Sequence, residues 1–214
     1  MAGLPDAAAV VMHPPLAPED RARGEFYAVL ARLYAAAPDT ALLRLIGAAP
    51  PLEHGDAGAD AGLARSWRRL REASGVMEAD AADGEYTALF IVVGRSEVDL
   101  HASHWASAGK SEKPLVNVRA DLSRLGLARF PHVSVYEDHL SALLETMRIL
   151  VLGADGRAPA SVAGQRAFFA AHLDPWIDAC CAAISTSAIA NYYRCVAELT
   201  QSLVAIERDA FALF

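Results

Sequence analysis

The sequence has no uninterrupted apolar run long enough to cross a membrane, although 54% of its 214 residues are hydrophobic. A membrane-spanning helix needs about 20 consecutive apolar residues, so we expect no stable membrane insertion. The first residues also lack the basic stretch that opens a secretory signal peptide. We therefore expect residues 1–16 to form a disordered arm and the protein to be cytoplasmic.

Cysteine is scarce, and its three copies form no recognisable framework. Cys180, Cys181 and Cys195 are odd in number and lack the spacing of metal ligands. They lie in apolar helical stretches, which predicts buried thiols in a reducing compartment. The charge balance, 19 basic against 26 acidic residues, gives a net charge of −7. A nucleic-acid-binding protein shows a basic stripe instead, so we expect no nucleic acid as partner.

Motifs of catalysis are missing as well. The sequence contains no G-x-S-x-G elbow, no Walker loop and no dinucleotide fingerprint. His101 and His104 have a spacing that could place two imidazoles on one metal, but no motif supplies a third ligand. They fall in residues 93–113, a stretch without periodicity, and we interpret them as polar residues of a mobile loop. The sequence therefore predicts no enzyme, no metal site and no cofactor.

Helical periodicity, by contrast, runs through almost the whole chain. Apolar residues recur in steps of three and four, most regularly over residues 189–213, and no strand-like alternation appears. Proline opens periodic segments, as at Pro18, and glycine closes them, as at Gly153. We predict an all-α protein, a single compact bundle of about nine to ten helices, either monomeric or homodimeric. The expected domain is residues 17–214, with an N-terminal lobe at 17–112 and a C-terminal lobe at 113–214.

The stretch from Ser134 to Leu152 carries the clearest candidate site. Ser134 lies three residues before Glu137, the spacing of a capping box, and a leucine-rich stripe follows. This predicts a helix that begins at Ser134, with Glu137, Asp138 and His139 in its first turn at the rim of an apolar surface. The cap explains Glu137, and the helix dipole can explain Asp138. His139 adds nothing to such a cap, which makes Asp138 and His139 a candidate binding pair.

Three blocks of the sequence, taken in order and spacing, resemble the TorD/DmsD/NarJ family of cytoplasmic chaperones for molybdoenzymes. They are E-Y-T-A-L-F at 85–90, V-Y-E-D-H-L at 135–140, and a stretch over 168–207 that contains H-L-D-P-W and N-Y-Y-R-C-V. The second block is similar to the family's Glu-Pro-x-Asp-His motif. Val135 and Tyr136 stand where that motif has its Glu and Pro, so Asp138 and His139 carry the resemblance.

The resemblance implies a TorD-like fold and a defined partner. Such a chaperone binds the twin-arginine signal peptide of a molybdopterin oxidoreductase and holds the apoenzyme until its cofactor is inserted before export. A peptide with two arginines and an apolar stretch favours a receptor that places a carboxylate beside an apolar groove. The site expected on this basis has Asp138 facing the arginines and His139 as its hydrogen-bonding neighbour, with an apolar wall, a rim and an adjoining acid. The remaining residues of this site are Tyr86, Leu89 and Phe90 in the wall, Tyr136 at the rim, and Glu137.

An alternative from another class is a helical small-molecule-binding sensor or regulatory domain without catalytic activity. A sensor of that kind needs an enclosed pocket and is usually joined to a DNA-binding unit. No basic recognition helix is visible in the sequence. The sequence alone leaves this alternative open.

Overall fold

The computed structural model describes residues 16–52, 58–91, 96–106, 113–129, 134–154 and 156–213. Over these ranges the chain forms ten α-helices and no β-strand beyond isolated bridges, which confirms the predicted all-α bundle. The helices are α1 (Pro18–Ala35), α2 (Thr40–Ala48), α3 (Ala59–Val76), α4 (Ala79–Phe90), α5 (Ala102–Trp105), α6 (Pro114–Arg124), α7 (Leu140–Leu152), α8 (Val162–His172), α9 (Ile177–Thr186) and α10 (Tyr192–Phe211). All but the last residue of the expected N-terminal arm lies outside the described residues.

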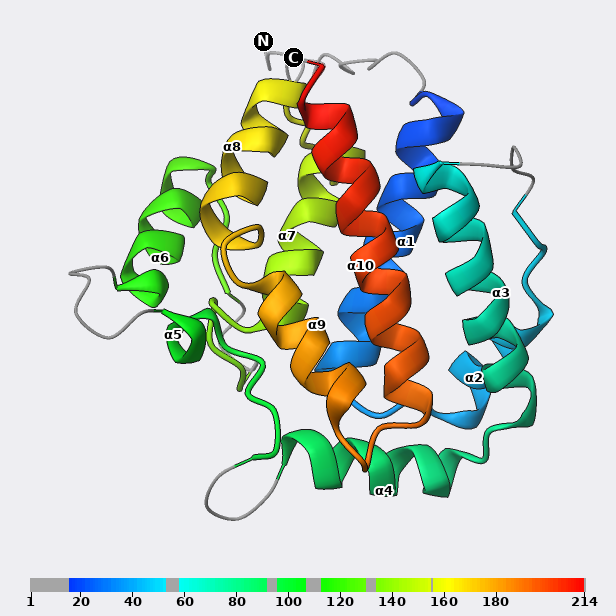
Figure 1. Ribbon diagram of the computed structural model, residues 1–214. Coiled ribbons are helices and arrows are strands. Elements are labelled where there is room, and N and C mark those ends of the chain that lie inside the picture. The colour runs from blue at the N-terminus through cyan, green and yellow to red at the C-terminus, as the bar shows by residue number, and fades with distance from the viewer. Residues whose placement is uncertain are drawn as a thin grey trace, which may run out of the picture.

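Helices α1 and α7 form the most extensive helix pair of the bundle. Gly24 makes their close approach possible, because a Cβ atom there would lie 2.3–2.6 Å from the side chain of Leu152. Helix α10 packs between α3 and α9, and α2 packs on α3. Figure 1 shows α4 lying across the end of the bundle at which α10 begins.

The core follows the predicted seam of the last helix. Tyr192, Val196, Leu199 and Leu203 are buried at helical spacing along α10. Two hydrogen bonds of 3.0 Å tie this helix to α1: one joins the hydroxyls of Tyr34 and Thr200, and in the other the Tyr193 hydroxyl donates to the carbonyl of Leu33. The seam is shorter than predicted, because its outermost members, Ile189 and Leu213, lie beyond the helix ends and are exposed.

Local stop and start signals place most of the helix ends. Pro18 opens α1, and the carboxylate of Asp39 caps α2 by accepting a 2.7 Å hydrogen bond from the N–H of Leu42. Gly153 ends α7 with φ = +77°, and a Cβ there would come within 2.5 Å of the carbonyl oxygen of Arg157. Only glycine adopts that backbone conformation without strain.

The α1–α7 and α3–α10 pairs both join helices from opposite sides of residue 113. One hydrophobic cluster also contains buried residues from before and after that position. The division into lobes at 17–112 and 113–214 stays a prediction.

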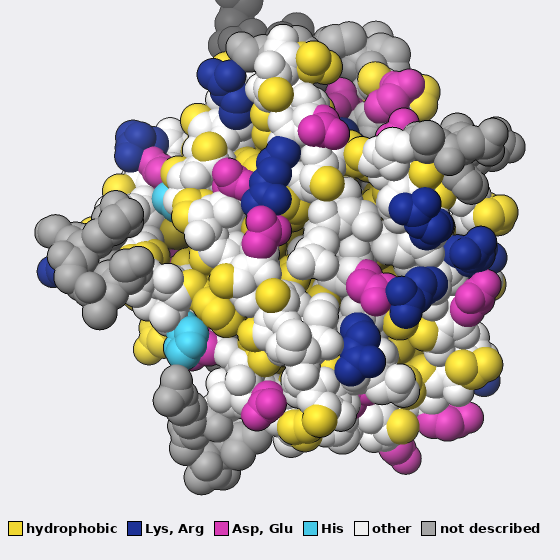
Figure 2. All heavy atoms as spheres, in the orientation of Figure 1, with side chains coloured by type: hydrophobic (Ala, Val, Ile, Leu, Met, Phe, Trp, Pro, Cys, Tyr) yellow, Lys and Arg dark blue, Asp and Glu magenta, His cyan; other side chains and the backbone are white. Residues whose placement is uncertain are grey.

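The described helices include none with the length and hydropathy that a membrane crossing requires. On the face shown in Figure 2, basic and acidic side chains are interspersed over α3 and α10. Arg68 and Arg69, the twin arginines of α3, have exposed side chains and pair with Glu72 and Glu198 at 3.8 and 2.7 Å. These arginines therefore belong to a solvated helix face.

Candidate functional site

The helix that follows the candidate site begins later than the sequence predicts. Helix α7 starts at Leu140, and its N-cap is His139, whose Nδ1 accepts a 3.2 Å hydrogen bond from the N–H of Ser141. The prediction that Ser134 and Glu137 form a capping box is therefore wrong, and so is the expectation that His139 adds nothing to the cap. His139 instead has extended backbone, and Asp138 and Leu140 on either side of it bond to the backbone of residues 100–102.

This backbone pairing is the physical reason for the late start. The N–H of Ala102 donates to the carbonyl of Asp138 at 3.0 Å, and the N–H of Leu140 donates to the carbonyl of Leu100 at 2.8 Å. Both bonds flank an antiparallel bridge between His101 and His139. A helix that began at Ser134 would need these same backbone groups for its own ladder.

Asp138 lies inside the protein and not at an open rim, which corrects the expectation from the sequence. Its side chain is only 2% exposed. One carboxylate oxygen accepts hydrogen bonds from the N–H and the hydroxyl of Ser103, at 3.1 and 2.5 Å. Ser103 lies in the first turn of α5, so Asp138 caps that short helix from a distance. The Asp-His pair thus supplies two caps, one for α5 and one for α7.

The described part of the expected 93–113 loop, residues 96–106, is packed and not a mobile loop. Val98 and Leu100 are buried in the core. Its polar side chains also bond locally, because the Nδ1 of His101 lies 2.9 Å from Oδ1 of Asp99. The His101 ring contacts the His139 ring edge-on, with centroids 4.8 Å apart. No group of three His, Cys, Asp or Glu side chains among the described residues could hold a metal ion.

A polar hollow of about 470 Å³ opens beside the paired backbone segments 100–102 and 138–140. Tyr86 and Phe90 of α4, with His139, lie on its lining together with His101 and Asp99. Two of the three predicted wall residues, Tyr86 and Phe90, therefore meet the predicted histidine in one hollow.

The other predicted wall and rim residues take different positions. Leu89 has no exposed surface and packs in the core, so it offers no surface to a ligand. Tyr136 is 55% exposed, and its ring centroid lies 6.4 Å from that of His101, at the edge of the polar hollow. Glu137 lies on the opposite side, where it lines a second, more apolar depression.

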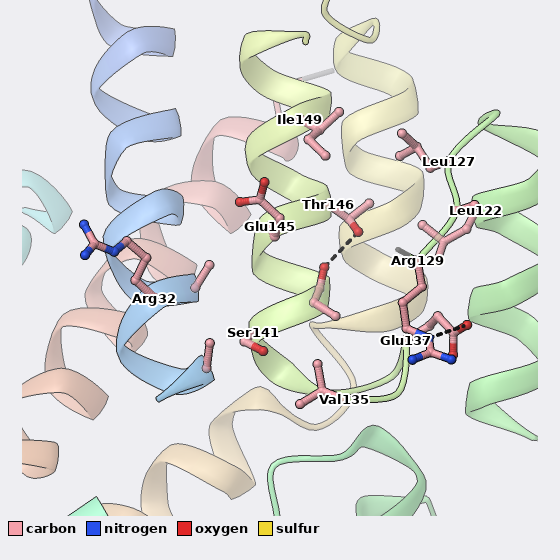
Figure 3. A pocket seen from close by; sticks show the side chains of 14 residues that line it. Arg32, Leu122, Leu127, Arg129, Val135, Glu137, Ser141, Glu145, Thr146 and Ile149 are labelled. Atoms are coloured by element: carbon pink, nitrogen blue, oxygen red, sulfur yellow. Dashed lines mark hydrogen bonds and ion pairs between the residues drawn. The ribbon is translucent and has the colours of Figure 1, made fainter. Parts of the chain in front are cut away.

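This second depression, which we call the apolar groove, has a volume of about 360 Å³ and lies between α1, α7 and the chain after α6. Figure 3 shows Ser141, Thr146 and Ile149 following one another along α7, with Leu122 and Leu127 across from them. Four charged side chains also line it. They are Arg32, Arg129, Glu137 and Glu145.

An apolar groove was expected beside Asp138, but the residues that form this one were not predicted, although part of their signal was in the sequence. Ala142, Thr146 and Ile149 repeat at steps of four and three along α7, outside the leucine stripe that faces the core. Exposed apolar residues that gather in one patch are typical of a surface that a partner covers. The α1 side of the groove, Ala31 and Ala35, comes from more than 100 residues earlier in the chain.

The two depressions adjoin. Ala35 and Val135 line both of them, so the apolar groove and the polar hollow meet at the C-terminal end of α1. Burial, followed by the nearby His101, lowers the pKa of His139 to about 4 and keeps its ring neutral. Burial works to raise the pKa of Asp99, but hydrogen bonds and charge from His101 outweigh it and lower that pKa. The hollow therefore combines a neutral imidazole with an ionised carboxylate.

One family model matches a stretch of the chain that includes most of the candidate site. The model of the nitrate reductase delta subunit family matches residues 56–182. The chain belongs to this family. Its members are NarJ/TorD-type chaperones for the maturation of molybdoenzymes, and they bind respiratory molybdoenzyme subunits.

The nitrate reductase delta subunit family is of the chaperone type and not of the catalytic type. The matched span contains most of the residues that line the two depressions, including those of α4 and α7. Helix α1, which forms one side of the apolar groove, lies outside the matched span. No curated protein matches the chain significantly.

Proposed function

We propose that this chain binds the twin-arginine leader of a molybdopterin oxidoreductase in the apolar groove. It holds the apoenzyme in the cytoplasm until the molybdenum cofactor has been inserted, and then releases it for export. The observation that carries the proposal is an apolar groove with a carboxylate, Glu137, at its mouth, on a chaperone whose family binds molybdoenzyme subunits. Family membership favours this function over the small-molecule sensor.

The chemistry of a leader fits the groove. A leader joins a basic segment to an apolar segment of about 7–15 residues. The apolar segment can cover Leu127, Ala142 and Ile149, which are partly exposed in the free protein. Burial of apolar surface contributes about 25 cal/mol per Å², whereas an ion pair at a rim contributes ~0.2–1 kcal/mol. The apolar segment therefore supplies most of the affinity, and the arginines set register and specificity.

The polar hollow extends the groove beyond Val135 and would receive the polar residues that flank the apolar segment. Tyr86 and Phe90 form its aromatic side, and His139 contributes a neutral ring. Tyr136 stands at the edge, where an exposed aromatic ring can close over a bound chain.

Asp138 and Leu89 act from behind this surface. Asp138 fixes α5 and with it the 96–106 segment that carries His101. Leu89 anchors α4 in the core, so that Tyr86 faces the hollow. In this proposal both are positioning residues.

The proposal is tested by calorimetric titration of the protein with synthetic leaders of cognate type, bearing Arg-Arg or Lys-Lys. We expect the Arg-Arg leader to bind more tightly, because a guanidinium pairs with a carboxylate through two parallel hydrogen bonds. Ala142→Glu places a charge in the apolar groove and should weaken binding more than about tenfold. Ala205→Glu, an exposed position on α10 away from the groove, is the matched control and should bind like the parent.

Equal affinities of the Ala142→Glu and Ala205→Glu variants would show that the leader binds elsewhere. Absence of binding by the parent protein would overturn the proposed function itself. Circular dichroism of both variants confirms that each remains folded.

A further inference from the structure

Glu137 receives two arginines from the same chain. Nε and Nη2 of Arg119, on α6, each lie 3.0 Å from Oε2 of Glu137. Nε of Arg129 lies 3.5 Å from Oε1 of the same carboxylate. One carboxylate with a guanidinium on each oxygen is the arrangement that a pair of arginines on a ligand would produce.

The carboxylate of Glu137 is more buried than the guanidinium of Arg119. The Glu137 side chain is 13% exposed, whereas that of Arg119 is 47% exposed. Burial works to raise the pKa of Glu137, but the hydrogen bond and charge of Arg119, with the charge of Arg129, outweigh it and lower that pKa. The carboxylate is therefore ionised and sheltered, while Arg119 has a free path into solvent.

The cluster stands at the mouth of the apolar groove. Glu137 and Arg129 both line the groove, and Figure 3 shows their side chains meeting at its edge. Glu145, the other acid on the lining, is already held by Arg148 one turn away, through two hydrogen bonds of 2.8 Å. Glu137 is thus the acid at which an incoming basic residue would compete with a partner from another helix.

We propose that Glu137 is the subsite for an arginine of the leader, and that Arg119 and Arg129 occupy it in the free protein as internal stand-ins. The inference rests on the proposed function of the groove. Binding then exchanges one guanidinium for another: Arg119 leaves Glu137 for solvent, and an arginine of the leader takes its place at the carboxylate. The number of ion pairs is the same before and after the exchange. Lysine lacks the planar guanidinium that matches a carboxylate, so a lysine in place of the arginine gains little affinity from the exchange. The stand-ins therefore serve selectivity for arginine.

The experiment is a double-mutant cycle read out by titration with the Arg-Arg leader. Arg119→Gln removes the exposed stand-in, and we expect binding to tighten about three- to fivefold. Arg124→Gln is the matched control, because it removes the same charge from the same helix, where Arg124 pairs with Asp121 and not with Glu137. We expect that control to change the affinity less than about twofold. In a Glu137→Gln background, Arg119→Gln should have no effect.

The outcomes separate the two proposals. If the parent binds the leader but Arg119→Gln and Arg124→Gln have equal effects, general charge explains the result and the stand-in role is overturned. Weaker binding by Arg119→Gln would likewise overturn it, since Arg119 would then support the bound peptide. A persistent effect of Arg119→Gln in the Glu137→Gln background would assign the exchange to another acid. If the parent binds no leader, the proposed function fails, and this inference fails with it.

Discussion

The carboxylate of Glu85, on α4, accepts a 2.7 Å hydrogen bond from the backbone N–H of Tyr193, in the first turn of α10. It also accepts from the N–H groups of Asn191 and Tyr192, at 2.9 and 3.1 Å. Helix α10 has no cap from its own N-cap side chain, so α4 supplies one. This places the Tyr193 ring 5.7 Å from that of Tyr86, a residue lining the polar hollow.

Glu85→Ala should lower the free energy of unfolding by about 1–3 kcal/mol, because three backbone donors at the start of α10 lose their acceptor. Urea denaturation followed by circular dichroism measures this. Glu25→Ala, an exposed glutamate within α1, is the control and should change stability by less than about 0.5 kcal/mol. Equal losses in the two variants would argue against the capping role.

Asp138→Ala should destabilise the protein by about 2 kcal/mol, because it leaves the N–H and hydroxyl of Ser103 without their acceptor. Because the two side chains bond to each other, adding Ser103→Ala to Asp138→Ala should lower the free energy of unfolding little further. Denaturation of the two single variants and the double variant measures this coupling.

Asp138→Asn separates positioning from direct contact with the leader. The amide oxygen can still accept from Ser103, so affinity for the Arg-Arg leader should stay within about twofold of the parent. Loss of binding at unchanged stability would mean that the Asp138 charge itself meets the leader.

His139 should make stability depend on pH between about 4 and 6.5. Its pKa falls from 6.5 to about 4 in the folded state, so the unfolded chain takes up the proton first as pH is lowered. The stabilising contribution, roughly 3 kcal/mol, is fully present above pH 6.5 and is lost as pH falls through 4. The carboxylates of Asp99 and Glu137, whose pKa values are lowered, also lose stabilisation in acid.

His139→Asn isolates the histidine contribution, because asparagine is a good N-cap that does not titrate. We expect the unfolding free energy of the parent to fall relative to that of this variant as the pH is lowered from 7 to 4. A difference that stays constant over that range would show that His139 does not titrate with unfolding. Denaturation at several pH values measures it.

Gly24→Ala should destabilise the α1–α7 pair by about 1–3 kcal/mol, because the new methyl group would overlap the side chain of Leu152. Gly62→Ala, within α3, is the control, since nothing lies within 4 Å of a Cβ there. It should instead stabilise the protein by about 0.5–1 kcal/mol through the better helix propensity of alanine. Thermal unfolding of the two variants should therefore shift in opposite directions.

The fold was largely predictable because its signals are local. Apolar periodicity marked the helices, and residues such as Pro18 and Gly153 marked their ends. The start of α7 was mispredicted because a distant backbone segment decides it. The Ser134–Glu137 spacing fits a capping box, but pairing of residues 138–140 with 100–102 outweighs that local preference.

The candidate site was predictable in part for the same reason. The resemblance brought Tyr86, Phe90 and His139 together, and the structure places them on one hollow. The burial of Asp138 depends on Ser103, 35 residues away, and periodicity gives no indication of that partner. The apolar groove depends on the distant Ala31 and Ala35, whose small side chains carry no motif.

The backbone ladder that joins Leu100 and Ala102 to Leu140 and Asp138 closes the base of a long excursion that contains α6. Both paired segments are followed or preceded by buried residues of the core, including Val98 and Leu143. Because His139 is the N-cap of α7, these bonds fix the residue at which that helix begins. The α7 side of the apolar groove is therefore positioned by backbone bonds whose residues lie outside the groove lining.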